Sequence, residues 1–339
     1  MSETPRTGDN ERGVDIMRAI QVTEFGGPEV LVETELPDPV AGPGEVVVGV
    51  AVVDTIFLET QIRESWGPRF GITPPYVPGG AAAGIVLSVG EGVDPSWTGR
   101  RVVAGPGIQG SYAEQLVAPV DRLTPVPDGL GLREAAALAH DGVTGTGITQ
   151  AARIRPGERV LILGASGGMG TLLVQLAHAA GARVVGAARG ERKLDLVREL
   201  GADAVVDYSQ DGWVDRAREA LGGAGADVVL DGVGGELGLA AFGLTADGGR
   251  VSAHGAPSGG FSPIDAAEAR RRGITLRGIA EVQFEADAVT RLMSVALAEA
   301  AAGRLRPVIA ETFPLARAAD AHRAIEARSV VGKALLTVG

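Results

Sequence analysis

The chain has 339 residues, 45% of them hydrophobic, and a formal net charge of −11 with histidine neutral. This length exceeds one ordinary hydrophobic core and favours two domains. The acidic balance argues against nucleic acid as a partner, because a phosphate backbone is bound through clustered positive charge. The chain contains no cysteine, which excludes disulfides, thiolate catalysis and cysteine-ligated zinc.

The N-terminal residues and the lengths of the apolar runs indicate where in the cell the protein is found. No apolar run reaches the roughly 18 residues that a membrane-spanning helix needs. Residues 1–16 are polar and lack the apolar core of a signal peptide, so we expect a disordered extension there. Together these features predict a cytoplasmic protein without a membrane partner, folded from near Met17 onward.

The chain changes character along its length. Residues 17–133 read as short strands between Gly/Pro turns, which predicts a compact, mostly β domain. Its clearest strands are expected at residues 45–53, 84–89 and 101–104.

Residues 134–273 alternate strands and helices instead, which predicts an α/β fold with a doubly wound parallel sheet. The buried strands are expected at residues 159–163, 183–187, 204–206, 227–230 and 250–253, with helices at 192–200 and 213–221. Residues 274–339 add a strand at 274–279, a long helix ending at Gly303, a short helix around 316–328 and a last strand at 333–338.

A glycine-rich turn joins the strand at 159–163 to a helix. Glycine lets the backbone turn sharply and lets phosphate oxygens approach main-chain N–H groups at the positive end of the helix. The context of strand, turn, helix and second strand predicts a dinucleotide site, the alternative being a packing turn without a ligand. The residues of the turn are Gly164, Ala165, Ser166, Gly167, Gly168, Met169 and Gly170.

The end of the second strand favours NADPH over NADH. An NADH site places Asp or Glu there to hold the ribose 2′-hydroxyl, whereas this chain has Arg189, followed by Lys193 on the next helix. These cations suit a 2′-phosphate. Glu191 is a counter-indication, and ordinary surface charge is the alternative interpretation of both cations.

Further motifs resemble the zinc-independent, zeta-crystallin-like quinone oxidoreductase branch of the medium-chain dehydrogenase/reductase superfamily. The resemblance covers nearly the whole chain from Met17. The motifs are Gly26-Gly27-Pro28-Glu29-Val30-Leu31, Pro43-Gly44-Glu45-Val46, Val89-Gly90-Glu91-Gly92-Val93, Gly110-Ser111-Tyr112-Ala113-Glu114, Gly157-Glu158-Arg159-Val160, Leu200-Gly201-Ala202-Asp203 and Gly332-Lys333-Ala334.

The resemblance implies a fold and a cofactor site. It implies a GroES-like β domain at residues 17–133, a Rossmann NADPH-binding domain at 134–273, and a segment at 274–339 that completes both. Lys193 and Tyr208 match positions that hold the 2′-phosphate, and Thr144 with its neighbour Val143 matches the stretch beside the nicotinamide. Gly232, Val233 and Gly255 match loops that line the same crevice.

The same resemblance argues against a metal. Zinc-dependent relatives use a Cys, a Gly-His-Glu triplet and a later Cys, where this chain has Ile56, Gly80-Ala81 and, at or beside the third position, His140. One possible ligand cannot hold a zinc ion that needs three. We therefore expect no metal.

The expected acceptor side diverges from the family. Ile56, Glu59 and Gln61 replace the Asn, Asp and Tyr of the branch, which leaves Asp54, Thr55 and Gln61 as candidates to orient a carbonyl; ordinary strand-end positions are the alternative. Trp66, Phe70 and Tyr76 are expected to form either an apolar lid or loop packing.

His140 and Asp141 precede the stretch beside the nicotinamide. One of them is a candidate to donate or relay a proton to the reduced substrate. The alternative is a histidine satisfied by backbone groups at a helix start.

Three functions remain open. The first is NADPH-dependent reduction of a quinone or α,β-unsaturated carbonyl compound (an enone). The second is a tailoring reductase dedicated to one bulky metabolite, and the third is a catalytically silent NADPH-binding protein. The resemblance also implies a homodimer paired through the strand at 274–279.

Overall fold

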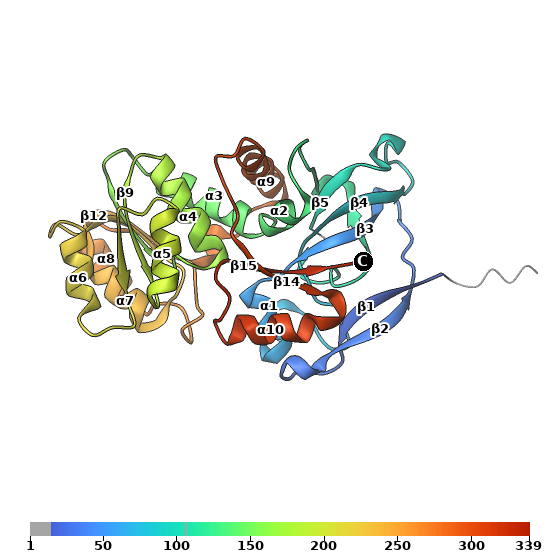
Figure 1. Cartoon of the computed structure of the whole chain (residues 1–339), viewed down its shortest axis with the longest axis horizontal. Coiled ribbons are helices and arrows are strands. Elements are labelled where there is room, and N and C mark those ends of the chain that lie inside the picture. Colours follow the sequence, from blue (N-terminus) through green and yellow to red (C-terminus); the bar gives the residue numbers. More distant parts are fainter. Residues whose placement is uncertain (1–14, 106) are drawn as a thin grey trace, which may run out of the picture.

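The computed structural model describes residues 15–105 and 107–339. Two large β-sheets, with the helices around them, form two lobes along the long axis of the molecule (Figure 1), and β1 and β2 make a separate two-stranded sheet. The disordered extension expected at residues 1–16 lies outside the described residues except at its end. There, β1 (Ile16–Val22) begins one residue before the predicted start and pairs with β2 (Leu31–Pro37).

A seven-stranded sheet joins distant parts of the chain. Its path runs β14-β15-β3-β4-β5-β7, and β6 pairs with β3. The C-terminal strand β15 lies antiparallel to β3, with Leu335 opposite Asp54. The strands are β3 (Glu45–Asp54), β4 (Ala82–Val89), β5 (Arg101–Ala104), β6 (Gln115–Pro119), β7 (Leu123–Pro125), β14 (Ile309–Pro314) and β15 (Lys333–Thr337).

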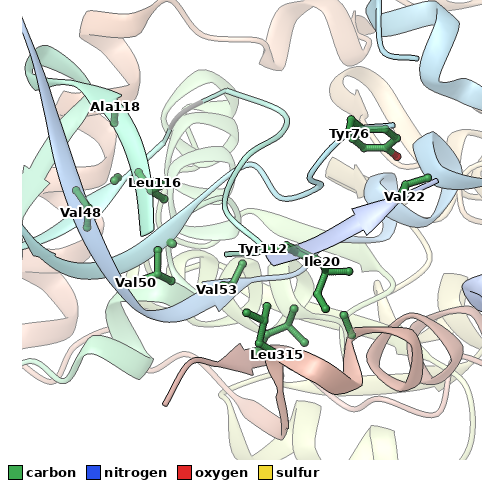
Figure 2. Packing of buried hydrophobic residues seen from close by; sticks show 14 of the residues in the cluster. Ile20, Val22, Val48, Val50, Val53, Tyr76, Tyr112, Leu116, Ala118 and Leu315 are labelled. Atoms are coloured by element: carbon green, nitrogen blue, oxygen red, sulfur yellow. The ribbon is translucent and has the colours of Figure 1, made fainter. Parts of the chain in front are cut away.

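Buried apolar side chains pack between this sheet, β1 and the C-terminal segment (Figure 2). Val53 of β3 and Ile20 of β1 are fully buried in this cluster beside Tyr112 and Leu315. β3 is buried over most of its length, at Val46–Val48 and Val52–Asp54 among others, and its run of valines explains why it was recognisable as a strand.

The second sheet is parallel throughout, in the order β10-β9-β8-β11-β12-β13. Its order confirms the predicted doubly wound sheet, because the order of the strands reverses between β8 and β11, where ligands of such sheets bind. The strands are β8 (Arg159–Leu163), β9 (Arg183–Ala188), β10 (Ala204–Asp207), β11 (Ala226–Asp231), β12 (Thr245–Ala253) and β13 (Thr275–Arg277).

Helices alternate with these strands because each has one apolar stripe. In α5, Leu194 and Val197 are buried while the flanking charged residues face solvent. The helices of this lobe are α4 (Gly168–Ala179), α5 (Glu191–Glu199), α6 (Trp213–Ala220), α7 (Gly235–Gly243) and α8 (Ala266–Arg271).

An apolar cluster joins the two lobes. It combines Val52 and Leu335 of the seven-stranded sheet with Leu138, Val143 and Leu172 of the helices before and after β8. The lobes are thus packed through a shared hydrophobic core. The helices outside the parallel sheet are α1 (Phe57–Gln61), α2 (Leu132–Ala137), α3 (Asp141–Ala152), α9 (Ala286–Ala301) and α10 (Ala318–Glu326).

The structure corrects two local predictions. The strand expected at 274–279 is shorter: β13 ends at Arg277, and the 3₁₀ turn η6 (Ile279–Val282) follows. The segment after β3 folds into α1, the π-helical turn η2 (Ile62–Trp66) and the 3₁₀ turn η3 (Gly67–Phe70), which sequence patterning missed. The remaining 3₁₀ turns are η1 (Pro28–Val30), η4 (Pro95–Trp97), η5 (Val120–Arg122) and η7 (Leu315–Arg317).

Across residues 15–105 and 107–339, no helix combines the length and apolar character that crossing a bilayer requires.

Candidate active site

The glycine turn has the backbone that an anion site needs. Gly164 directly follows β8 and has φ +70°, a conformation that favours glycine. A Cβ on Gly170 would lie 2.1 Å from the Gly164 carbonyl oxygen, so the helix start fits tightly against the turn. The first N–H groups of α4 have no intrahelical acceptor. They form a cradle suited to phosphate oxygens.

Two later loops meet beside this turn. The backbone after β11 and the backbone after β12 are so close that a Cβ on Gly255 would lie 2.1 Å from Gly232. The carboxylate of Asp231 accepts hydrogen bonds of 2.9 Å from the N–H groups of Val233 and Gly234. The structure therefore brings the predicted loop residues together at the carboxyl ends of adjacent strands.

A group of cations gathers at the end of β9, around the half-buried Tyr208. The Nζ of Lys193 donates to the Arg328 carbonyl oxygen over 2.9 Å. Arg328 precedes the C-terminal strand, and sequence reasoning missed it. Desolvation lowers the pKa of Lys193, and the positive charges of Arg189, Arg328 and Arg192 lower it further. Several unneutralised cations in one place favour an anionic ligand such as a 2′-phosphate.

Three buried charged residues lie against the end of the glycine turn, next to Gly168. Lys333, the first residue of β15, places its Nζ 2.7 Å from Oδ1 of Asp54 and 3.0 Å from Oδ2 of Asp141. Asp54 ends β3 and Asp141 begins α3, so this triad joins both lobes. All three side chains are buried. The triad of Asp54, Lys333 and Asp141 is the least expected part of the site.

Burial and charge shift the pKa values in the triad. Desolvation raises the pKa of Asp54 to about 8, and the negative charge of Asp141 adds to this effect while Lys333 opposes it. The pKa of Lys333 is raised, because the two neighbouring carboxylates outweigh the effect of its burial. Lys333 is therefore cationic, and Asp54 holds its proton far above the usual range of a carboxyl group.

His140 occupies an accessible position next to the triad. Its backbone N–H donates to Oδ2 of Asp54 over 3.2 Å, and its side chain forms no cap of α3. The imidazole is exposed to solvent, yet enough protein surrounds it that desolvation lowers its pKa. The expected alternative, in which backbone groups satisfy the ring, therefore finds no support at the start of α3.

Thr55 and Gln61, the other candidates for orienting a carbonyl, differ in their surroundings. The hydroxyl of Thr55 is buried and donates to the Ala334 carbonyl oxygen over 2.6 Å. That bond links β3 to β15 and uses the hydrogen that would polarise a substrate. Gln61 is half-buried at the end of α1, so its amide remains a candidate.

Glu59 turns into the protein rather than toward an acceptor. Its carboxylate accepts hydrogen bonds from Ile56 N and Gly80 N, each 3.1 Å, and from the Tyr112 hydroxyl at 2.8 Å. Oη of Tyr112 lies 3.0 Å from Nε2 of His322. His322 is fully buried, and burial lowers its pKa to about 3.

This inward network has two effects on the site. Glu59 holds the backbone at Gly80, and the neutral His322 links α10 to Tyr112 and, through it, to Glu59. Tyr76 is likewise buried in the core and pairs with Val22 across an isolated bridge, which identifies its part of the loop as packing and not a lid.

Comparisons with known proteins agree with this architecture. Residues 42–128 match the family described as "Alcohol dehydrogenase GroES-like domain", and residues 168–297 match "Zinc-binding dehydrogenase". The quinone oxidoreductase of Rattus norvegicus is 32% identical over 96% of this chain and 98% of its own. The chain belongs to the quinone oxidoreductase branch of the medium-chain dehydrogenase/reductase superfamily.

One more related sequence and one solved structure show the same similarity. A 2-haloacrylate reductase of Burkholderia is 31% identical over 95% of this chain and 98% of its own. The crystal structure of Escherichia coli quinone oxidoreductase complexed with NADPH superimposes with a TM-score of 0.88, at 27% identity, over 94% of this chain and 99% of that one. As a member of this branch, the chain is an oxidoreductase.

The segment around Ile56 and Gly80 offers few side chains that could hold a metal. The side chains of Ile56 and Ala81 carry no ligand atoms, and the carboxylate of Glu59 already accepts three hydrogen bonds from the protein. Among the residues that the structure describes, no group of three or more His, Asp or Glu side chains is arranged to hold a metal ion.

Proposed function

We propose that this oxidoreductase transfers hydride from NADPH to a quinone or an α,β-unsaturated carbonyl compound without a metal. The observation that carries the proposal is the pairing of the glycine cradle at Gly164–Gly170 with the cations Arg189, Lys193 and Arg328 at the end of β9. The first suits a pyrophosphate, and the second suits the 2′-phosphate that distinguishes NADPH from NADH.

The residues present fit both the pyrophosphate and the 2′-phosphate of NADPH. Phosphate oxygens would accept from the N–H groups at the start of α4, beside Ser166 and Met169. Lys193, Arg328 and Tyr208 would hold the 2′-phosphate, and Thr144 with the loops at Gly232, Val233 and Gly255 would line the nicotinamide end. The cofactor supplies the hydride when bound.

The protein's own contribution is positioning and proton supply. Glu59 fixes the loop at Gly80, and Gln61 is the candidate to orient the acceptor carbonyl. His140 is accessible and its pKa is lowered, so it is neutral at physiological pH and can pass a proton on from solvent. Catalysis would rest mainly on holding donor and acceptor carbons in contact.

A cofactor and acceptor screen tests the proposal. Purified protein should oxidise NADPH faster in the presence of a quinone or enone than without one, and faster with NADPH than with NADH. Treatment with a chelator, followed by added zinc, should leave the rate unchanged. No acceleration by any acceptor would contradict a reductase function, and a rate restored only by zinc would contradict the absence of a metal.

A tailoring reductase for one bulky metabolite is the second candidate. The small residues Gly80 and Ala81 and the apolar Ile56 favour it, because they leave room where relatives carry larger polar groups. Such an enzyme would accept simple quinones poorly and one large substrate well. Turnover of simple quinones at rates similar to those of related quinone oxidoreductases would exclude it.

The third reading, a catalytically silent protein, differs in one measurement. Transfer of deuterium from labelled NADPH into a product would exclude it.

We also propose that the protein is a cytoplasmic homodimer and that its domains divide near residues 133 and 273.

A further inference from the structure

The buried triad has an unbalanced count of charges. Two carboxylates, Asp54 and Asp141, share a single ammonium group, that of Lys333. If all three were ionised, one negative charge would stay uncompensated in the interior. Burying an uncompensated charge is costly, so such a group binds a proton instead. The proton belongs to the pair of carboxylates together.

The triad also lies directly against the glycine turn. A Cβ on Gly168 would stand 2.2 Å from Oδ2 of Asp141 and 3.1 Å from Cδ of Lys333. Gly332, next to Lys333, donates its N–H to the Ser166 carbonyl oxygen over 2.8 Å and forms a bridge with Gly167. A carboxylate therefore touches the backbone where an anionic pyrophosphate would bind.

A negative charge at that position would repel the pyrophosphate, and a proton bound to the triad removes this repulsion. An ionised second carboxylate would repel the phosphates of the dinucleotide across a short distance in a poorly solvated environment. A protonated triad is neutral overall and does not oppose them. By linkage, a ligand that binds the protonated form more tightly draws a proton onto the protein.

We propose that the triad of Asp54, Lys333 and Asp141 takes up a proton from solvent when the dinucleotide binds. The inference rests on the proposed binding of NADPH. No covalent bond forms or breaks: one carboxylate oxygen gains a proton from water or buffer, and Lys333 keeps its charge throughout.

The charged surroundings agree with this direction. Besides Lys333 and Asp141, Asp54 is influenced by Glu59, whose negative charge further favours the protonated form. The exposed imidazole of His140 adjoins Asp141 and is neutral when its lowered pKa is exceeded. With a pKa of about 8 for Asp54, the free protein holds the proton only partly near pH 8, and uptake is measurable there.

Calorimetry of NADPH binding tests the proposal without any turnover. Binding enthalpies are measured near pH 8 in Tris and in HEPES, whose ionisation enthalpies differ, and the slope between them gives the protons taken up. We expect a net uptake of a fraction of a proton per NADPH for the wild type, since the pKa of Asp54 is raised to about 8 and the free protein is therefore only partly protonated at this pH.

Two variants provide the comparison. In Asp54→Asn and in Asp141→Asn, one carboxylate and Lys333 form a neutral pair, so uptake should fall close to zero in each. Two variants are used so that the test still stands if one of them does not fold, which circular dichroism would show. Asp128→Asn, on an exposed turn, is the matched control and should behave as the wild type. The titration of the 2′-phosphate itself contributes equally to all four proteins.

The outcomes separate the two proposals. Uptake by the wild type that disappears in a folded triad variant supports the inference. Equal uptake in the wild type and in both Asn variants, or no uptake by the wild type, overturns it while NADPH binding stands. If no protein in the set binds NADPH, the proposed function fails and takes the inference with it.

Discussion

The glycines of the phosphate turn are not equivalent at the scale of single residues. A Cβ on Gly170 would collide with backbone, 2.1 Å from the Gly164 carbonyl oxygen and 2.8 Å from Cα of Ala165. On Gly167, the nearest atom would be 3.4 Å away, and the backbone has an extended conformation that any residue adopts. Space, rather than flexibility, explains the glycine at 170.

This difference predicts a difference in stability. We expect Gly170→Ala to lower the free energy of unfolding of the cofactor-free protein by about 1–3 kcal/mol, the usual range for overpacking. Gly167→Ala is the matched control and should change it by less than about 1 kcal/mol. Urea unfolding without cofactor measures both, and equal effects of the two substitutions would contradict the assigned crowding.

The cation group at the end of β9 has a consequence for cofactor choice. A charge-assisted hydrogen bond contributes roughly 1.5–3 kcal/mol. Lys193→Ala should therefore reduce the preference for NADPH over NADH, expressed as the ratio of kcat/KM values, by about tenfold or more. The kcat/KM for NADH itself should change little, because NADH lacks the 2′-phosphate.

Arg198→Ala is the control for this substitution. Arg198 lies on the same helix, α5, but pairs with Glu191 and Asp195 on the solvent side. It should leave the ratio unchanged. A parallel loss of kcat/KM for both cofactors in Lys193→Ala would point to a structural role of Lys193.

At the scale of elements, the triad ties the ends of β3, β15 and the start of α3 to one another. The folded protein keeps the proton of Asp54 up to about pH 8, whereas its ordinary pKa is 3.8. Between these values the unfolded chain binds fewer protons than the folded protein. The stabilising contribution of this carboxyl is therefore complete below about pH 4 and is lost as the pH rises toward 8.

Asp54→Asn removes that titration. The free energy of unfolding of the wild type minus that of Asp54→Asn should fall between pH 5 and pH 8, by at most about 1.4 kcal/mol per pH unit. Urea unfolding at several pH values measures it, with Asp128→Asn as a control whose difference stays flat. If this difference in the free energy of unfolding rose with pH instead, the pKa of Asp54 would be lowered by folding and not raised.

Elements could be predicted from the sequence more reliably than contacts. The strands β5 and β8 have the predicted bounds, since each is a short apolar run between turn residues. The helices after β3 were missed because the segment 57–70 is short and lacks a clear apolar stripe. Patterning reports which face is buried, and it is silent where a chain bends within a few residues.

The part of the candidate site that is contiguous in the sequence could be predicted, whereas the contacts between distant residues could not. The glycine turn is contiguous, so its role was visible along the chain. The partners of Asp54 were not, because Lys333 lies 279 positions away and meets it only through the pairing of β15 with β3. A clue existed: Lys333 is one of two lysines in the chain and follows Gly332 at the start of an apolar strand. Arg328 carried no comparable signal.

At the scale of the whole molecule, the parallel sheet ends at β13, whose outer edge has no partner strand in the described part of the chain. An unpaired edge strand can pair with a second copy about a twofold axis. We expect the protein to have twice the mass of one chain in light scattering coupled to size exclusion.

A charge at that edge should disrupt the pair. Thr275 is exposed on β13, and Thr275→Lys would place like charges near one another across the axis, shifting the mass toward that of a single chain. Thr312→Lys, on β14 at the edge of the other sheet, is the control and should leave the dimer intact. Dimers that persist in Thr275→Lys would argue for another interface.

The bond from Gly332 to the Ser166 carbonyl oxygen has a consequence for biosynthesis. The glycine turn leaves the ribosome about halfway through translation, but the strand that supports it is among the last segments made. A nascent chain can therefore form the parallel sheet early and still lack a finished cofactor site. We expect newly made protein to become competent for NADPH only after release, so that the dinucleotide cannot act as a template for folding during synthesis.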